Sequence, residues 1–493
     1  MSLLLVAFSI LVLFIITLIF LKCRRPSNFP PGPPALPIVG SSLLVGSRPA
    51  VRMHEWKEKY GDIFGWYNGR QRVVVISDFH VLKKLFSEDA ASGRIIRRLV
   101  RTESTLPLNI GLVGSEGELW KIHRRFALST LRDLGMGKNW LEDVIIGEVE
   151  SMCAIFRAQK GAPINPSVLV TNTISNVICA MIFGKRFELT DPKFSRITSL
   201  ISANLAVHKL DFLAQTFPFL MWFPNYVSKK IAMARQNVKD LRAFMSEMIR
   251  EHDASPDPNA ECPDYLFAYR RERAQTTNPD VKETFTEMQL IGSLFDLFAA
   301  GSEATTTTLL WAMVHLIENP DVMRTAQAEI DERVGKQKVI TSSDRVLLPY
   351  IEGVIMEAQR CGNTSPLGVP HRSLEEIKVG GYTIPENTIL VANTASIHYD
   401  TRYWKDPQRF DPSRYLKDGA LLVRPEALLP LGVGKRLCLA EPLVRMELFL
   451  FIANLLRCFT LELPEGKTLS SNDYVSSLVN CPNPFELIFT PRF

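Results

Sequence analysis

One cysteine, Cys438, lies in a loop whose composition suits a metal-binding thiolate. Residues 429–442 read Leu-Pro-Leu-Gly-Val-Gly-Lys-Arg-Leu-Cys-Leu-Ala-Glu-Pro. Gly432 and Gly434 allow a tight turn and a close approach of the backbone to a flat ligand. Arg436 places a positive charge two residues before the sulfur, within reach of an anion at the edge of such a ligand.

The residues from Glu441 onward follow an amphipathic pattern that predicts a helix, whose N-terminal dipole stabilises a thiolate at Cys438. A flat, dianionic ligand with a metal that binds thiolate is haem. Taken alone, the loop also fits a tight turn around a buried thiol. We expect the other cysteines to be buried reduced thiols, because their spacing fits neither a zinc site nor a disulfide framework: Cys23, Cys153, Cys179, Cys262, Cys361, Cys458 and Cys481.

A second unusual stretch, residues 298–308, reads Phe-Ala-Ala-Gly-Ser-Glu-Ala-Thr-Thr-Thr-Thr inside a long helical pattern. Thr284-Phe-Thr-Glu287 predicts a capping box, and Asn319-Pro320 ends the helix. Roughly 33 residues at 1.5 Å each give about 50 Å, enough to cross a large domain. Gly301, the threonines and the charge of Glu303 are all unfavourable in an apolar helix interior, which indicates a functional site.

Two further pairs have helical spacing. Glu357 and Arg360 are three residues apart, and Trp120 and Arg124 are four apart, so each pair shares one face of its helix. Alone, each pair is also what an ordinary solvated helix face contains.

The loop around Cys438 resembles the haem-binding loop of the cytochrome P450 family, Phe-x-x-Gly-x-Arg-x-Cys-x-Gly. Gly434, Arg436 and Cys438 match this pattern. Leu431 and Ala440 replace the usual Phe and Gly, which changes packing near the sulfur and leaves the ligand in place. The resemblance implies haem b (iron protoporphyrin IX) with Cys438 as the axial ligand of the iron.

Other motifs of the family follow in the same chain order. Glu357-Ala-Gln-Arg360 resembles its Glu-x-x-Arg helix, and the segment Phe410-Asp-Pro-Ser-Arg-Tyr415 resembles the one whose arginine, here Arg414, completes a structural charge triad. The resemblance also implies four donors to the haem propionates: Trp120, Arg124, His371 and Arg436.

The stretch from Ala300 to Thr305 resembles the oxygen-binding groove of the family. The resemblance implies that Gly301 leaves room above the iron and that Glu303 holds the acidic position of a proton relay. The family usually has Thr where this chain has Ala304. The resemblance implies that the missing hydroxyl ordinarily helps to deliver protons to iron-bound dioxygen. Thr305 follows, but one residue turns about 100° around a helix, so its hydroxyl is expected to point elsewhere. Thr305, through a local distortion of the helix, or a hydroxyl of the substrate could take this role.

The family layout also implies residues of the substrate pocket, although ordinary core packing is an equal alternative for each: Phe298, Ala300, Ala304, Leu367, Val369, Leu478 and Val479. Residues 205–220, with Phe212, Phe217 and Phe219, are expected to form a lipid-facing entrance.

The implied activity is insertion of one atom of dioxygen into a hydrophobic organic substrate, a xenobiotic, steroid or lipid. Electrons would come from NADPH through a separate flavoprotein reductase, for which Lys121, Arg125 and Lys435 are candidate docking charges. Because Ala304 lacks the usual hydroxyl, an isomerase or dehydratase that rearranges lipid peroxides is an alternative function. With Ala440, Ala304 also leaves open a non-catalytic haem or ligand binder.

The elements that must position these residues are mostly helices. The patterns predict a mainly α fold with small β-sheets (α+β), built like a cytochrome P450 around a long central helix and a Cys haem loop. Strands are predicted at residues 72–77 and 388–392, with a hairpin at 377–384. Residues 252–280, polar and proline-containing, are expected to be a surface connection.

The chain start predicts a membrane anchor. Residues 1–21 are almost wholly apolar, long enough to span a bilayer, and a basic cluster at Lys22, Arg24 and Arg25 follows. We expect an uncleaved signal-anchor, a basic and proline-rich hinge over 22–45, and a haem-thiolate domain over 46–493 on the cytosolic side of the endoplasmic reticulum. The net charge of only +5 over 493 residues does not indicate a nucleic-acid partner.

Overall fold

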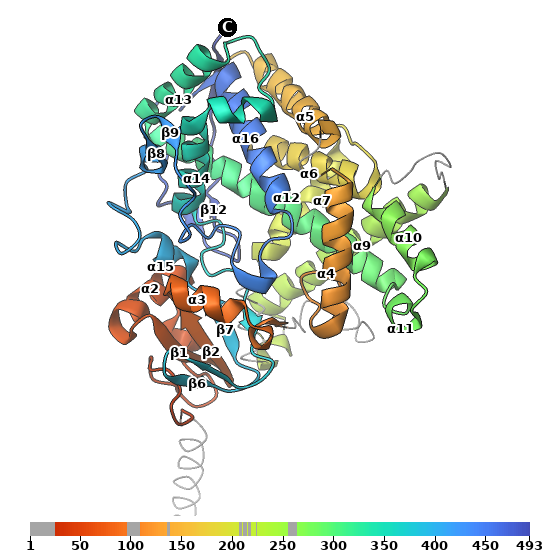
Figure 1. Ribbon diagram of the computed structural model, residues 1–493, viewed down its shortest axis with the longest axis vertical. Coiled ribbons are helices and arrows are strands. Elements are labelled where there is room, and N and C mark those ends of the chain that lie inside the picture. Colours follow the sequence, from red (N-terminus) through yellow and green to blue (C-terminus); the bar gives the residue numbers. More distant parts are fainter. Residues whose placement is uncertain are drawn as a thin grey trace, which may run out of the picture.

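The computed structural model describes residues 25–95, 109–135, 139–206, 210, 214, 218–222, 224–254 and 264–493. The fold is mainly helical with small sheets, as the sequence predicts. Helices make up the larger part of the molecule, and a five-stranded sheet lies at the end near the start of the described chain (Figure 1).

The helices of the described residues vary from one turn to 32 residues. Their bounds are α2 (Pro49–Tyr60), α3 (Phe79–Phe86), α4 (Gly117–Asp133), α5 (Asn139–Ala158), α6 (Ser167–Phe183), α7 (Pro192–Ala206), α9 (Tyr226–Ala254), α10 (Tyr265–Gln275), α11 (Pro279–Lys282), α12 (Glu287–Glu318), α13 (Pro320–Arg333), α14 (Pro349–Gly362), α15 (Thr394–His398) and α16 (Glu441–Cys458).

The predicted central helix is α12, which packs on α6, α14 and α16 and passes through the helical part of the molecule (Figure 1). Its start differs from the prediction. Thr286, not Thr284, is the N-cap, and its hydroxyl accepts a hydrogen bond from the N–H of Gln289. The hydroxyl of Thr284 donates instead to the carbonyl of Val281 (2.7 Å), so the predicted capping box is wrong.

The five-stranded sheet has the order β1-β2-β7-β4-β3. Its strands are β1 (Ile63–Asn68), β2 (Gln71–Ile76), β3 (Gly93–Arg94), β4 (His371–Arg372) and β7 (Ile389–Ala392). Only β2 and β7 run parallel, and they join residues from opposite ends of the chain. The predicted strands at 72–77 and 388–392 are confirmed as β2 and β7.

The smaller sheets are two-stranded. The predicted hairpin is confirmed as β5 (Ile377–Val379) and β6 (Tyr382–Ile384), with Gly380 and Gly381 at positive φ in the turn. The others pair β8 (Leu416–Lys417) with β9 (Ala420–Leu421), β10 (Phe459–Glu462) with β13 (Ile488–Pro491), and β11 (Tyr474–Val475) with β12 (Cys481–Pro482).

The prediction of a surface connection over residues 252–280 is wrong for its described part. That part contains the end of α9, then α10 and α11. Tyr265 and Tyr269 of α10 are fully buried, and both rings pack edge-on against Phe126 of α4. Two large rings four residues apart make one apolar face, which outweighs the polar character of the rest of the helix.

The predicted anchor at 1–21 lies outside the described residues. Within the described ranges, the helices lack an apolar stretch that could cross a bilayer. The described part of the proline-rich hinge, from Arg25 on, has no α-helix and is held in place by hydrogen bonds. Arg25 donates to the carbonyls of Pro30 (2.7 Å) and Pro33 (2.6 Å), and the N–H of Gly65 in β1 donates to Pro31 (2.7 Å).

Candidate active site

The loop that carries Cys438 is a hydrogen-bonded turn just before α16. The N–H of Cys438 donates to the carbonyl of Leu431 (2.9 Å), and the N–H of Leu437 donates to Gly434 (3.0 Å). Gly434 has a φ of +79°, and a Cβ atom there would overlap the carbonyl group of Phe86 in α3. The turn therefore requires glycine at this position, which explains part of the sequence pattern.

The sulfur of Cys438 is partly buried. Burial raises the pKa of this thiol, while the N–H of Ala440 and the charge of Arg124 act in the opposite direction. Arg124 of α4 donates to the carbonyl of Leu437 at 2.7 Å, which fixes its guanidinium beside the loop. A bound metal ion would supply the positive charge that makes the thiolate the stable form.

Arg436 is buried next to Trp120. Its Nε donates to Ser92 (2.9 Å) and its Nη2 to Ser115 (2.7 Å), both backbone carbonyls. The guanidinium carbon lies 3.8 Å from the centroid of the Trp120 ring. Burial, followed by repulsion from neighbouring guanidinium groups, lowers the pKa of Arg436 to about 8.

Those neighbours are Arg124 and Arg94, and sequence reasoning missed Arg94. Arg94 lies on β3 and donates through Nη1 to the carbonyls of Val369 (2.9 Å) and Pro370 (3.2 Å). Its Nε is buried and has no partner among the described residues. Burial, with a smaller contribution from Arg124, lowers the pKa of Arg94 to about 10. In the sequence, Arg94 is a basic residue ahead of apolar positions, a pattern that only weakly indicates a binding role.

The carboxylate of Glu116 does not balance the positive charge of these arginines. Glu116 faces Arg436 and is shared, since it accepts the backbone N–H of Arg94 (2.9 Å) and pairs with Arg372. Three guanidinium groups, of the buried Arg94 and Arg436 and of the half-buried Arg124, therefore lie beside the loop of Cys438. That of Arg94 has an N–H without a partner among the described residues. This donor set fits a ligand with two carboxylates, so the residues present fit haem.

His371 is the partner of Arg94 across β3 and β4. Its Nδ1 lies 2.8 Å from the carbonyl of Ala91, so Nδ1 carries a proton and donates. Burial, and then the charges of Arg94 and Arg436, hold the pKa of His371 well below its usual range. In this state Nε2 is an acceptor. Donation to a carboxylate requires a second proton, which a nearby anion favours by raising the pKa.

Ala300 and Ala304 are exposed, although the residues around them on α12 are mostly buried. Their spacing of four places both on one face of the helix, which therefore lines an open space. Gly301 does not share this face. A Cβ atom on Gly301 would lie 2.6 Å from Cδ1 of Ile178, so the glycine allows α12 and α6 to approach closely.

Glu303 and Thr305 point away from each other. Glu303 is buried and accepts a hydrogen bond from the hydroxyl of Ser202 on α7 (2.7 Å), and burial raises its pKa. Thr305 donates to Oε2 of Glu447 on α16 (3.2 Å). The expectation that the Thr305 hydroxyl points elsewhere than the side chain at 304 agrees with this geometry.

Of the predicted pocket residues, Phe298 is fully buried, and its ring packs on Phe244 of α9 (6.0 Å between centroids). Leu367, Leu478 and Val479 are half-buried, and Val369 is exposed. Phe212 and Phe217 lie outside the described residues, and Phe219 is exposed.

The predicted charge triad is confirmed. Arg360 is fully buried and contacts Glu357 through two nitrogens (2.7 and 2.8 Å), while Nε of Arg414 reaches the same carboxylate at 2.9 Å. Tyr415 adds a fourth contact to Glu357 (2.9 Å). Since Arg360 also donates to the carbonyl of Pro407 (2.7 Å), the triad holds the irregular segment before the Cys438 loop.

Asp296 is another residue that sequence reasoning missed. Its Oδ2 accepts the N–H groups of Leu112 (2.7 Å) and Val113 (2.8 Å), and Gln289 exchanges two hydrogen bonds with Gly111. Burial raises the pKa of Asp296 to about 6. α12 thus holds the segment that leads into α4. A charge in an apolar helix pattern, the signal used for Glu303, also applies to Asp296.

Comparison with known proteins agrees with this description. The sequence model of the cytochrome P450 family matches residues 30–489. The chain is 35% identical to human cytochrome P450 2J2 over 93% of this chain and 91% of that protein. It is 33% identical to mouse cytochrome P450 2U1 over 96% and 93%, and 34% identical to cytochrome P450 18a1 of Drosophila melanogaster over 91% and 84%.

A mainly helical fold with a cysteine loop beside buried guanidinium groups defines a haem-thiolate protein. The chain belongs to the cytochrome P450 family, whose members are monooxygenases that bind haem b through a cysteine thiolate. Redox partners and hydrophobic substrates are general to the family.

Proposed function

We propose that this chain is a membrane-tethered monooxygenase that oxidises a xenobiotic, steroid or lipid, with Cys438 as the axial ligand of the haem iron. The observation that carries the proposal is the contact of Arg124 with the Cys438 loop, where it donates to the carbonyl of Leu437 at 2.7 Å, while its charge also acts on the buried Arg436. Thiolate ligand and propionate donors thus belong to one site. When bound, haem supplies the oxygen activation, and the protein supplies orientation, a dry site and protons.

Residues of the chain have separate tasks in this proposal. Arg94, Arg124, Arg436 and Trp120 bind the propionates, with His371 as a fifth donor once an anion raises its pKa. Ala300 and Ala304 leave the space in which dioxygen and substrate meet. Glu303 is the acidic group of the proposed proton relay, and burial raises its pKa.

Electrons are proposed to come from NADPH through a separate flavoprotein reductase. Lys121, Arg125 and Lys435 are all exposed. Asp89 interacts electrostatically with Lys121 and Lys435, the latter at 2.6 Å, so these two lysines belong to one surface near the Cys438 loop. An acidic face on the reductase would be complementary to it.

The tether is proposed to be the apolar chain start in the endoplasmic reticulum membrane. Exposed apolar side chains, two in the predicted hinge and one in the segment before α9, support a membrane contact. Ile38 and Leu43 are 67% and 64% exposed, and Trp222 is 76% exposed. Apolar side chains of this size at a surface are typical of an interface with another phase or protein.

Substrate-dependent NADPH consumption by the haem-loaded protein, with purified reductase and a panel of apolar compounds, tests the proposal. We expect product that contains one oxygen atom from dioxygen. Turnover of a lipid hydroperoxide without NADPH would favour a rearranging enzyme instead, and full haem loading with no turnover of either kind would favour a ligand binder.

A further inference from the structure

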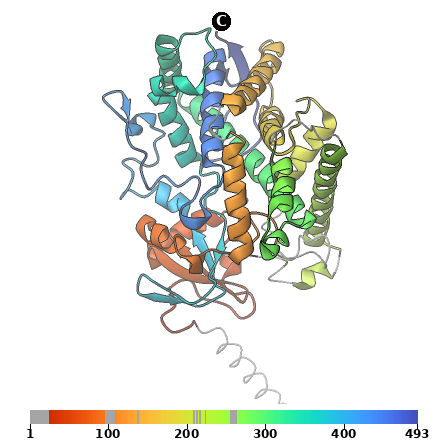
Figure 2. The same ribbon diagram turned by 45° about the vertical axis from the view of Figure 1, so that its right-hand side comes forward.

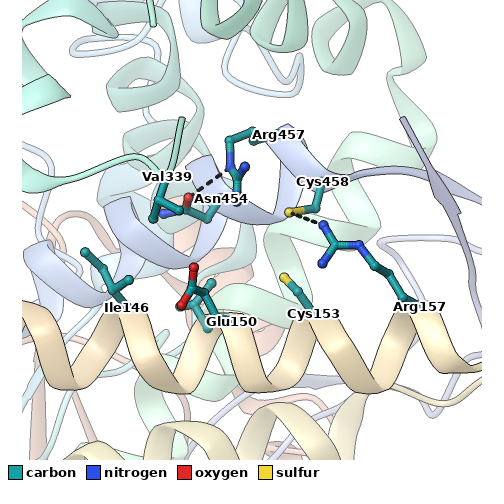
Figure 3. A pocket seen from close by; sticks show the side chains of 9 residues that line it. Ile146, Glu150, Cys153, Arg157, Val339, Asn454, Arg457 and Cys458 are labelled. Atoms are coloured by element: carbon teal, nitrogen blue, oxygen red, sulfur yellow. Dashed lines mark hydrogen bonds between the residues drawn. The ribbon is translucent and has the colours of Figure 1, made fainter. Parts of the chain in front are cut away.

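Two buried thiols lie next to each other between α5 and α16, away from the Cys438 loop. They belong to Cys153 and Cys458, which are both 2% exposed. The two side chains interact directly. Figure 3 shows the sulfur atoms facing each other, one from the α5 helix and one from the end of α16. Neither residue belongs to the site described above.

Two arginines accompany this thiol pair. Arg157 of α5 donates through Nη2 to the sulfur of Cys458 at 3.3 Å. Arg457 adds a second positive charge and is held by a hydrogen bond to Oδ1 of Asn454 (3.2 Å; Figure 3). The interaction with Cys153, followed by the charges of Arg457 and Arg157, lowers the pKa of Cys458.

Cys153 behaves in the opposite way. The interaction with Cys458 and burial raise the pKa of Cys153 well above its usual range, so it keeps its proton. The pair therefore combines a cysteine whose thiolate, the nucleophilic form, is favoured by two arginines with a neighbouring cysteine that stays a thiol. This is the composition that a redox-active dithiol needs.

A cavity of about 90 Å³ gives access to the pair. Its lining residues come from α5, α16 and the segment before α14: Ile146, Val149, Glu150, Cys153, Arg157, Val339, Asn454, Arg457 and Cys458 (Figure 3). Glu150 and Arg157 are exposed, so they mark the side that faces solvent. Since one water molecule takes about 30 Å³ in the liquid, hydrogen peroxide fits this space.

We propose that Cys458 and Cys153 form a redox-active dithiol that hydrogen peroxide oxidises to a disulfide. The thiolate of Cys458 attacks one peroxide oxygen, the O–O bond breaks, and hydroxide leaves as water after it gains a proton. Cys458 is then a sulfenic acid. The sulfur of Cys153 attacks it, the S–O bond breaks, and the second oxygen leaves as water with the proton of Cys153. Two thiols are oxidised, and one peroxide is reduced to two waters.

The arginines have a defined part in this reaction. Their charges stabilise the thiolate of Cys458 and the hydroxide that leaves it. The disulfide would tie α5 to the end of α16, the helix that begins just after the Cys438 loop. Oxidation would therefore fix two elements of the helical core to each other.

The test uses the full-length, haem-loaded protein treated with a stoichiometric amount of hydrogen peroxide. Free thiols are then blocked, and peptides are analysed by mass spectrometry without reduction. We expect a peptide crosslinked between Cys153 and Cys458 that dithiothreitol releases, formed before the haem absorption band changes. Cys481 is the internal control. It is more exposed than Cys458, but burial raises its pKa to about 11, so it should stay reduced.

Variants identify the roles of the two sulfurs. In Cys153→Ser, oxidation should stop at a sulfenic acid on Cys458, which a 1,3-dione probe traps. In Arg157→Gln, the crosslink should form at least several-fold more slowly, while Cys481→Ser should leave its rate unchanged. Two outcomes in the peroxide-treated wild-type protein would overturn the proposal. One is oxidation of Cys481 before Cys458, and the other is a Cys458 that stays unmodified.

Discussion

The hydroxyl of Thr305 lies 3.2 Å from Oε2 of Glu447, in the interior between α12 and α16. The other carboxyl oxygen, Oε1, has no partner among the described residues. Burial raises the pKa of Glu447 to about 8, so at neutral pH the carboxyl is mostly protonated. The threonine next to Ala304 is thereby turned toward the core and away from the exposed face of α12.

Replacement of Glu447 by Gln should remove a pH dependence of stability. In the unfolded chain this carboxyl ionises near its ordinary pKa of about 4.3, whereas in the folded protein it ionises near 8. Wild-type stability is therefore unaffected by this group at pH 4 and falls as pH rises from about 4.3 to 8, by a few kcal/mol. Melting temperatures of both proteins between pH 5 and 8 test this. Melting temperatures that change equally with pH in the two proteins would contradict this expectation.

Ala304→Thr and Thr305→Val should have different effects, because the two side chains face different surroundings. A hydroxyl at 304 enters the open space beside α12, so we expect a larger share of the electrons from NADPH to appear in product and less in peroxide. Thr305→Val should leave that share unchanged and cost about 1 kcal/mol of stability, because it loses one buried hydrogen bond. The measurement is the amount of product and of peroxide formed per NADPH consumed. If Ala304→Thr and the wild type form the same amount of product per NADPH, the first expectation is wrong.

Gly434→Ala should lower haem incorporation. The new Cβ atom overlaps the backbone of Phe86, and φ at this position is +79°. Gly432→Ala is the matched control, because Gly432 has the same φ with open space around it. The control should cost only the strain of positive φ, about 1–2 kcal/mol. Haem-to-protein ratios after purification compare them, and similar ratios would show that the contact with Phe86 is unimportant.

Arg94→Gln should speed the loss of haem. If Arg94 contacts a propionate, the lost charge-assisted hydrogen bond is worth about 1.5–3 kcal/mol, which corresponds to roughly a 10- to 100-fold faster transfer of haem to a scavenger protein. Arg125→Gln, an exposed position on α4, is the control and should change little. Equal transfer rates for the two variants would place Arg94 outside the haem site.

Much of the site was predictable because it follows local rules. The turn before Cys438, the helix around Glu303 and the pairing of Glu357 with Arg360 each depend on residues close in sequence. Arg94 was not predictable in the same way, because its role arises where β3 meets β4 from the other half of the chain.

The buried face of α10 and the thiol pair were missed for a similar reason. Tyr265 and Tyr269 are buried because they pack against Phe126 on α4. The pKa of Cys458 is lowered by Cys153 and Arg157 of α5, together with Arg457. Composition indicates polarity along a segment, but it does not show which distant element covers that segment. Asp296 differs, since its charge within an apolar helix pattern was visible in the sequence.

The carbon monoxide difference spectrum of the reduced protein tests most directly whether Cys438 binds the haem iron. We predict the absorption band of a thiolate-ligated haem for the wild type and its loss in Cys438→Ser, with Cys481→Ser unchanged. A Cys438→Ser protein that keeps the wild-type band and full oxidative turnover would contradict the account of this site.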